Sequence, residues 1–240
     1  MPMSLGQRQP AVRCSEHLET HQVRVSQERF INYSYVVIDR SSGSGKAALI
    51  DPAWEPETLR EVCHRAGARP SVILVTHAHW DHTNLADILS HEFKIPVLMS
   101  AMEVAASGFS ATRLDTFDDG SAIPIGGSTI RALVTPGHTR GSACFLTGGE
   151  LFTGDTVFME GVGVCEEYHG AASDMFRSVR RLRRVIPPQV RVFPGHRYGL
   201  PIGLPLEQVL LHNFYFCIED ERQFVDFRMR RSAARSLPFL

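Results

Sequence analysis

The sequence predicts an α/β fold in which two β-sheets pack face to face and helices cover their outer faces. Strand-like and helix-like segments alternate along much of the chain, but several strands follow one another directly between residues 129 and 153. This mixture favours two packed sheets over one doubly wound parallel sheet. The length of 240 residues and a hydrophobic content of 43% suffice for one such domain with a sizeable core.

The first half of the chain contains short apolar runs separated by amphipathic segments. Strands are expected where β-branched and aromatic residues gather between turns, at 32–39, 47–51, 71–76 and 96–99. Helices are expected at 56–66, at about 83–91 and at 101–107. Gly67 ends the first of these helices because it readily adopts the conformation that closes a helix.

The second half adds consecutive strands and then helices. Strands are expected at 129–135, 142–146, 150–153 and 190–193, and helices at 173–186, 205–216 and 219–230. The helix at 173–186 has an apolar stripe of Met175, Val179, Leu182 and Ile186, and two prolines stop it. We therefore divide the chain into a polar lead-in (1–20), a main domain (21–203) and a C-terminal helical extension (204–240).

Composition excludes several classes of protein. The net charge of −1 argues against a nucleic-acid binder, and no apolar run approaches the ~18 residues of a membrane span. The polar N-terminal segment lacks a signal-peptide pattern, so a cytoplasmic location is expected. The five cysteines are far apart and form no C-x-x-C pair, which signals neither a disulfide framework nor a thiolate zinc site.

Positive charge gathers in the last part of the chain. Residues 171–240 carry 12 arginines against 6 acidic residues. Four of these arginines fall on the helix face opposite the apolar stripe: Arg177, Arg180, Arg181 and Arg184. Such a face is either simply solvated or attracts an acidic partner.

The strongest chemical signal is the sequence His77-Ala78-His79-Trp80-Asp81-His82, which directly follows an apolar run. Residues two apart share a side of an extended chain but not of a helix. His77 and His79 can therefore converge only if the segment is extended or looped at the end of its strand.

Three later segments repeat this arrangement of an apolar strand, a glycine and a polar side chain. His138 follows Pro136-Gly137, Asp155 follows Gly154, and His196 follows Pro194-Gly195. Each of these side chains alone could be an ordinary loop residue. Together, strand ends meeting at one edge could bring five imidazoles and two carboxylates to a single point.

The number and type of donors decide the predicted chemistry. A structural zinc ion closes four positions and does not need seven ligands. Seven nitrogen and oxygen donors suit two metal ions about 3.5–4 Å apart with an open face. Imidazole and carboxylate favour zinc, with iron or manganese as alternatives.

These motifs resemble the metallo-β-lactamase superfamily, and within it the glyoxalase II-like branch. The resemblance covers about residues 23–200 and implies an αββα sandwich. It also implies that His77, His79 and His138 hold one metal and that Asp155 bridges both. The second metal would be held by Asp81, His82 and His196.

Three further stretches resemble zinc-dependent hydrolases encoded beside trans-acyltransferase polyketide synthases: Asn32-Tyr33-Ser34-Tyr35, Ile50-Asp51-Pro52-Ala53-Trp54 and Glu160-Gly161-Val162-Gly163. This resemblance implies release of acyl groups from acyl carrier protein thioesters, with the four-arginine face as a candidate carrier surface. Val164 stands where glyoxalase II has a glutathione-binding lysine, and only about 40 residues follow His196. Both departures argue against glutathione recognition.

The expected reaction is thioester hydrolysis by a metal-bridging hydroxide, with Asp81 as ligand and candidate proton acceptor. Candidates for substrate contact are Trp80, Cys165, Tyr168, His169 and Tyr198. Packing or solvated-loop roles are the alternative for each of them. Two other functions stay open: hydroxyacylglutathione hydrolase (glyoxalase II), and an iron persulfide dioxygenase with one metal held by His77, His138 and Asp155. A non-catalytic binding protein on this scaffold is a further alternative.

Overall fold

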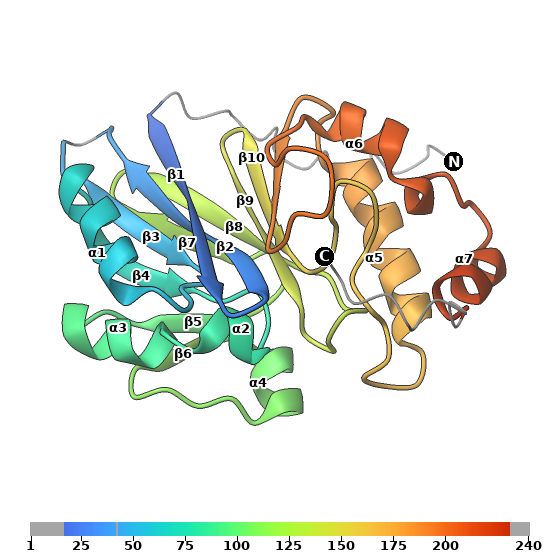
Figure 1. Ribbon diagram of the computed structural model, residues 1–240, viewed down its shortest axis with the longest axis horizontal. Coiled ribbons are helices and arrows are strands. Elements are labelled where there is room, and N and C mark those ends of the chain that lie inside the picture. The colour runs from blue at the N-terminus through green and yellow to red at the C-terminus, as the bar shows by residue number, and fades with distance from the viewer. Residues whose placement is uncertain (1–16, 42, 231–240) are drawn as a thin grey trace, which may run out of the picture.

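The computed structural model describes residues 17–41 and 43–230, and it has the expected two sheets between layers of helices (Figure 1). The first sheet has the order β1-β2-β3-β4-β5-β6. Its strands are β1 (Leu18–Gln27), β2 (Phe30–Asp39), β3 (Lys46–Ile50), β4 (Arg69–Leu74), β5 (Val97–Ser100) and β6 (Leu114–Phe117). The β1, β2 and β3 strands are antiparallel neighbours, whereas β3 to β6 run parallel.

The second sheet has the order β11-β10-β9-β8-β7. Its strands are β7 (Ala122–Ile125), β8 (Ser128–Val134), β9 (Ala143–Thr147), β10 (Glu150–Gly154) and β11 (Arg191–Pro194). Both β8 and β10 pair antiparallel with β9, and β11 runs parallel to β10. The carboxyl ends of β8, β10 and β11 therefore point to the same edge of the sheet.

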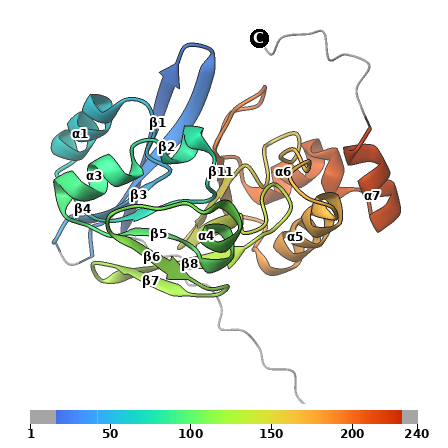
Figure 2. The same ribbon diagram turned by 90° about the horizontal axis from the view of Figure 1, so that it is seen from below.

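Helices cover the outer faces of the two sheets (Figures 1 and 2). They are α1 (Pro56–Arg65), α2 (Trp80–Thr83), α3 (Ala86–Phe93), α4 (Ala101–Ser107), α5 (Ala171–Val185), α6 (Leu206–His212) and α7 (Glu221–Arg228), with the 3-10 helix η1 (Phe214–Phe216). In Figure 1, α1 and α3 lie on one side of the strands, and α5, α6 and α7 lie on the other. None of the helices within the described ranges combines the length and apolar character of a membrane span.

The core is built in three apolar layers, which explains the four-layer αββα arrangement. Leu59 of α1 and Leu89 of α3 pack on the outer face of the first sheet. Between the sheets, Tyr35 of β2 contacts Phe152 and Phe193, with ring centroids 5.0 and 5.7 Å apart. The third layer joins α5 to the second sheet, and the predicted stripe of Met175, Val179, Leu182 and Ile186 is fully buried there.

The structure differs from the expected elements in a few places. It adds β1, β6 and β7, which the sequence pattern did not predict. Because β1 begins at Leu18, the last residues of the predicted lead-in are part of a sheet; residues 1–16 lie outside the described part of the chain. The predicted helix at about 83–91 is two helices, α2 and α3, and the one at 205–216 ends at His212 before η1 begins.

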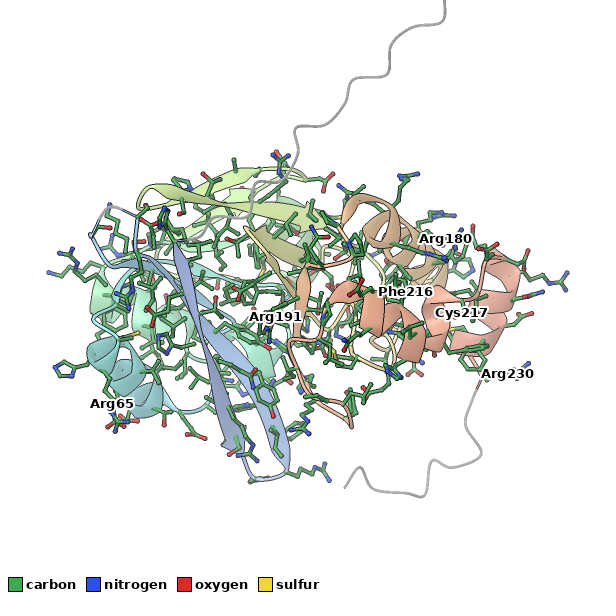
Figure 3. The ribbon with its side chains drawn as sticks, turned by 90° about the horizontal axis from the view of Figure 1, so that it is seen from above. Arg65, Arg180, Arg191, Phe216, Cys217 and Arg230 are labelled. Atoms are coloured by element: carbon green, nitrogen blue, oxygen red, sulfur yellow. The ribbon has the colours of Figure 1, made fainter. Side chains whose placement is uncertain are left out.

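The C-terminal helices dock on α5 beside the second sheet (Figure 2). Phe224 of α7 packs against Phe176 of α5, with ring centroids 5.4 Å apart. Arg183 of α5 donates to the carbonyl oxygen of Phe216 in η1 at 2.9 Å. Figure 3 shows Phe216 and Cys217 at this end of the molecule, together with Arg180.

Candidate metal centre

The four segments with candidate ligands meet at one edge of the sandwich. The histidine motif follows β4 of the first sheet, and His138, Asp155 and His196 follow β8, β10 and β11 of the second. Asp51 follows β3, which runs parallel to β4. The edge is therefore supplied by both sheets, so that residues far apart in the sequence face each other across it.

Three histidines form the first group of donors. Nδ1 of His79 lies 3.0 Å from Nε2 of His77 and 2.9 Å from Nε2 of His138. Three ring nitrogens this close are placed to direct their lone pairs at one shared cation. These three nitrogen atoms lie close enough to one another to hold a single metal ion.

A second group is formed by His82, Asp81 and His196. Oδ2 of Asp81 lies 3.7 Å from Nε2 of His82 and 3.3 Å from Nε2 of His196. These donors too lie close enough together to hold one metal ion.

Asp155 lies between the two groups. Its Oδ1 is 3.4 Å from Nε2 of His82, and its Oδ2 is 3.6 Å from Nε2 of His138. Oδ2 also lies 3.4 Å from Nε2 of His196. A single carboxylate thus reaches donors of both groups, which is the placement required of a bridging ligand.

Buried polar atoms without partners support a cation at this point. Nε2 of His82 and Oδ1 of Asp155 are buried and have no hydrogen-bond partner within the described part of the chain. Leaving such atoms unpaired costs about 1–3 kcal/mol each, so proteins rarely retain them without a reason. A divalent cation would satisfy both atoms, and the seven donors therefore fit the metals that the sequence predicts.

The charges of the site are strongly coupled. Burial lowers the pKa of His77, and the neighbouring His82 and His138 lower it further. Burial alone would also lower the pKa of His196, but Asp155 and Asp81 raise it to about 10. Burial opposes ionisation of Asp155, yet His196 and His82 hold its pKa well below the usual range.

Two glycines make room for this geometry. Gly154 has a φ of +47°, and a Cβ atom there would lie 2.3 Å from Oγ1 of Thr76. At Gly195, a Cβ atom would lie 2.5 Å from the His82 ring and 2.7 Å from Oδ1 of Asp155. The glycines before Asp155 and His196 therefore allow the two sheet edges to approach closely, in addition to permitting a turn.

Two further polar residues, Asp51 and Asn32, contact the donors, and the sequence alone predicted no role for them. Asp51 is buried and accepts hydrogen bonds from the backbone N–H and hydroxyl of Thr76, and its Oδ2 lies 2.9 Å from Nδ1 of His82. Nδ2 of Asn32 donates to Oδ2 of Asp81 at 3.0 Å. Asp51 had a usable signal, because it directly follows an apolar strand, as the candidate ligands do.

The candidates for substrate contact divide by exposure. Trp80 is 71% exposed and directly follows His79, and Tyr198 is 61% exposed and lies two positions after His196. Tyr198 also packs edge-on against Phe158, with ring centroids 5.0 Å apart. Two more exposed apolar side chains are Phe30 and Ile31, and the Ile31 carbonyl is 2.8 Å from Nδ1 of His196.

The exposure of side chains changes along the segment that follows Gly161. Cys165 is buried, with its thiol donating to the Gly163 carbonyl, and burial raises the pKa of this thiol to about 11. Tyr168 is half-buried and donates to Asp174, whereas His169 is exposed. The structure thus places Cys165 in the core rather than on an open channel.

Most of the four-arginine face is paired within the chain. Arg177 contacts Asp174 and Glu221, and Arg181 contacts Asp119 and the Val134 carbonyl. Arg180 lies 3.7 Å from Glu219. Arg184 is exposed and has no ion pair with another residue of the described ranges.

Comparison with known proteins identifies the family. The model of the metallo-β-lactamase superfamily matches residues 28–196, which include strands β2 to β11 and every candidate ligand. The chain belongs to the metallo-β-lactamase superfamily. The two sheets with helices on their outer faces agree with this family.

The chain is also similar to individual proteins described as zinc-dependent hydrolases. It is 41% identical to "Probable polyketide biosynthesis zinc-dependent hydrolase BaeB" of Bacillus velezensis, over 89% of this chain and 94% of that one. It is 37% identical to the corresponding PksB protein of Bacillus subtilis over the same shares. Cytoplasmic hydroxyacylglutathione hydrolase of Arabidopsis thaliana is 32% identical over 70% of this chain and 64% of that one.

A solved structure agrees on the fold. A metallo-β-lactamase from Staphylococcus aureus superposes with a TM-score of 0.79, covering 90% of this chain and 69% of that one. The two sequences are only 21% identical, so this likeness concerns the fold alone.

Proposed function

We propose that this protein is a two-zinc hydrolase that cleaves acyl thioesters of an acyl carrier protein in polyketide biosynthesis. One observation carries the hydrolase assignment: two groups of metal donors lie side by side, and Asp155 reaches both. The thioester and the carrier are inferred from the relatives described as polyketide biosynthesis hydrolases and from Val164, which stands where glyoxalase II has a glutathione-binding lysine.

The seven donors are proposed to act as the ligands. His77, His79 and His138 would hold one zinc ion, and Asp81, His82 and His196 the other. Bound zinc supplies a hydroxide nucleophile near neutral pH and stabilises negative charge on the acyl oxygen.

The side chains of the protein would orient the reactants and accept a proton from the attacking water. Asn32 fixes Oδ2 of Asp81 by its hydrogen bond of 3.0 Å, so the other oxygen of this carboxylate is proposed to receive a proton from the attacking water. Partial desolvation of the phenol beside the donor residues, with Asp155 and Asp81 nearby, raises the pKa of Tyr198 to about 12, and the phenol is proposed to stay neutral and donate to substrate. A thiol has a pKa of about 8.5 and leaves without a strong general acid.

Exposed apolar side chains around the donors suit an acyl group. Trp80 and Tyr198, each within two residues of a proposed ligand, remain exposed although they are large and mainly apolar. Such side chains gathered beside a polar site are typical of ligand contacts rather than of folding. We therefore assign the acyl chain to this side of the centre.

The decisive experiment is a substrate panel on zinc-loaded protein, with acyl-glutathione, acyl-coenzyme A and acyl-carrier-protein thioesters of the same acyl group. We expect the highest kcat/KM for the carrier-bound thioester. A higher kcat/KM for lactoylglutathione would instead indicate a hydroxyacylglutathione hydrolase. An active protein with one iron per chain would favour the persulfide dioxygenase.

A further inference from the structure

Every histidine of the two donor groups is bonded at its outer ring nitrogen. The outer nitrogen is the ring nitrogen that faces away from the other donors. Its five partners are the Thr76 hydroxyl for His77, Glu167 for His79, Asp51 for His82, the Val164 carbonyl for His138 and the Ile31 carbonyl for His196. Only two of these partners are carboxylates. Asp51 stands behind the second donor group, and Glu167 stands behind the first.

The geometry of His79 fixes which of its nitrogens carries the proton. Its Nδ1 converges with the inner nitrogens of His77 and His138, so this atom must present a lone pair to a cation. The proton then resides on Nε2, which lies 2.5 Å from Oε1 of Glu167. A carboxylate that accepts this N–H holds the ring in one tautomer and increases the electron density at the ligating nitrogen.

The segment that carries Glu167 is held on both sides. On one side, the Val164 carbonyl accepts from Nδ1 of His138 at 2.9 Å. On the other, the Tyr168 phenol donates to Asp174 of α5, and the Arg140 guanidinium lies 4.4 Å from the centre of the Tyr168 ring. Glu167 therefore lies between two anchored residues, which keeps its carboxylate close to His79.

Glu167 also faces open space on its far side. With Arg140, Tyr168 and Glu103, it lines a cavity of about 110 Å³. The Glu167 side chain is 43% exposed, whereas that of Asp51 is 4% exposed. Solvent screens an exposed carboxylate more strongly, so its effect on the metal should be weaker than that of Asp51.

We propose that Glu167 is a positioning residue that strengthens metal binding by the three-histidine group through His79. The role is independent of which acyl group or carrier the enzyme uses, because it concerns the free protein and its metal. It also gives the segment after Gly161 a function of its own, because this segment supplies the carboxylate that contacts His79 of the first donor group.

The test compares zinc binding by three variants of the full-length chain. Glu167→Ala removes the acceptor, and Glu167→Gln keeps an acceptor but not the charge. Glu19→Gln is the matched control, because Oε1 of Glu19 lies 2.6 Å from Nε2 of His21, away from the donor groups. Zinc dissociation constants are measured by chelator competition, absorption spectra are recorded with cobalt, and the melting temperature of each metal-free protein is determined.

We expect Glu167→Ala to weaken one of two zinc sites by about tenfold, the lower end of the range for such outer partners, and to shift the cobalt spectrum. Glu167→Gln should fall between it and the parent, and Glu19→Gln should match the parent. The metal-free melting temperature should not change. Zinc affinity and cobalt spectrum equal to those of the parent would overturn the proposal. So would equal losses in both Glu167 variants together with a lower metal-free melting temperature, which would show that Glu167 only holds the loop.

Discussion

Oδ2 of Asp51 lies 2.9 Å from Nδ1 of His82, and both side chains are buried. The same carboxylate accepts from the Thr76 hydroxyl at 2.6 Å and from the Thr76 backbone N–H at 2.8 Å. Asp51 thus ties the end of β3 to the end of β4 and to the second donor group at once. It orients the imidazole whose inner nitrogen is buried and unpaired.

Asp51→Asn should weaken zinc binding at the second donor group by about 10–100-fold, the range for losing an outer partner of a metal-bound histidine. Asparagine is a suitable substitution because it has a similar size and tolerates the φ of +46° found at this position. Chelator competition measures the loss. Asp226→Asn, an exposed change in α7, is the control, and parent-like affinity in Asp51→Asn would contradict the assigned role.

Asp155→Asn should reduce the metal content from about two zinc ions per chain and lower kcat by at least ~100-fold. The reason is that a neutral amide cannot offset the repulsion between two cations as a carboxylate does. Elemental analysis of the purified parent and variant, together with turnover of one thioester, checks both effects. Near-parent turnover by the variant would show that Asp155 is not the bridge.

Zinc binding should release protons from the protein and become tighter as pH rises. The pKa of His196 is raised to about 10 in the metal-free protein, so this imidazole is charged at pH 7 and must lose its proton to ligate. Below that pKa, each proton displaced increases the apparent affinity about tenfold per pH unit. Calorimetry in buffers with different heats of ionisation counts the protons.

The His196→Ala variant distinguishes the proton lost by His196 from a proton lost by metal-bound water. His196→Ala should release about one proton fewer than the parent on zinc binding. In the metal-free protein the sign is opposite: the raised pKa stabilises the fold fully below about pH 6.5, and this contribution is lost as pH rises towards 10. Equal proton release by parent and variant would refute the assignment.

Arg184→Glu should raise the KM for a carrier-bound thioester about threefold to fivefold at low salt, equivalent to one exposed ion pair of up to ~1 kcal/mol. Arg184 is chosen because Arg177, Arg180 and Arg181 face carboxylates of the chain itself. Arg65→Glu on α1 is the control with the same change in charge, and Figure 3 shows Arg65 at the opposite end from Arg180. Equal effects of both variants would exclude this face as the carrier surface.

The strands that the sequence did not predict are all edge strands. β1 and β6 are the two edges of the first sheet, and β7 is an edge of the second. An edge strand has one neighbour and more exposed side chains, so its apolar alternation is weaker than that of a central strand. β7 also contains Pro124, which a central strand does not tolerate but an edge strand does.

The gathering of donors could be predicted because its signal is local. The candidate ligands follow four apolar strands, and strands that run the same way end at a common edge. The sequence by itself therefore determined the fold class, the α5 stripe and the set of seven donors that the structure brings together. These features depend on a few neighbouring residues at a time.

Only the tertiary structure decided which carboxylates contact the outer nitrogens of the donor histidines. Asp51 and His82 are 31 positions apart, and Glu167 and His79 are 88 positions apart, so no local pattern links either pair. The arginines of α5 likewise have distant carboxylate partners, from α7, from the turn before it and from Asp119, in addition to the local pair of Arg177 with Asp174. An acidic residue and a distant base form a contact only once packing has brought their two elements together, and hydrophobic periodicity carries no information about such a pair.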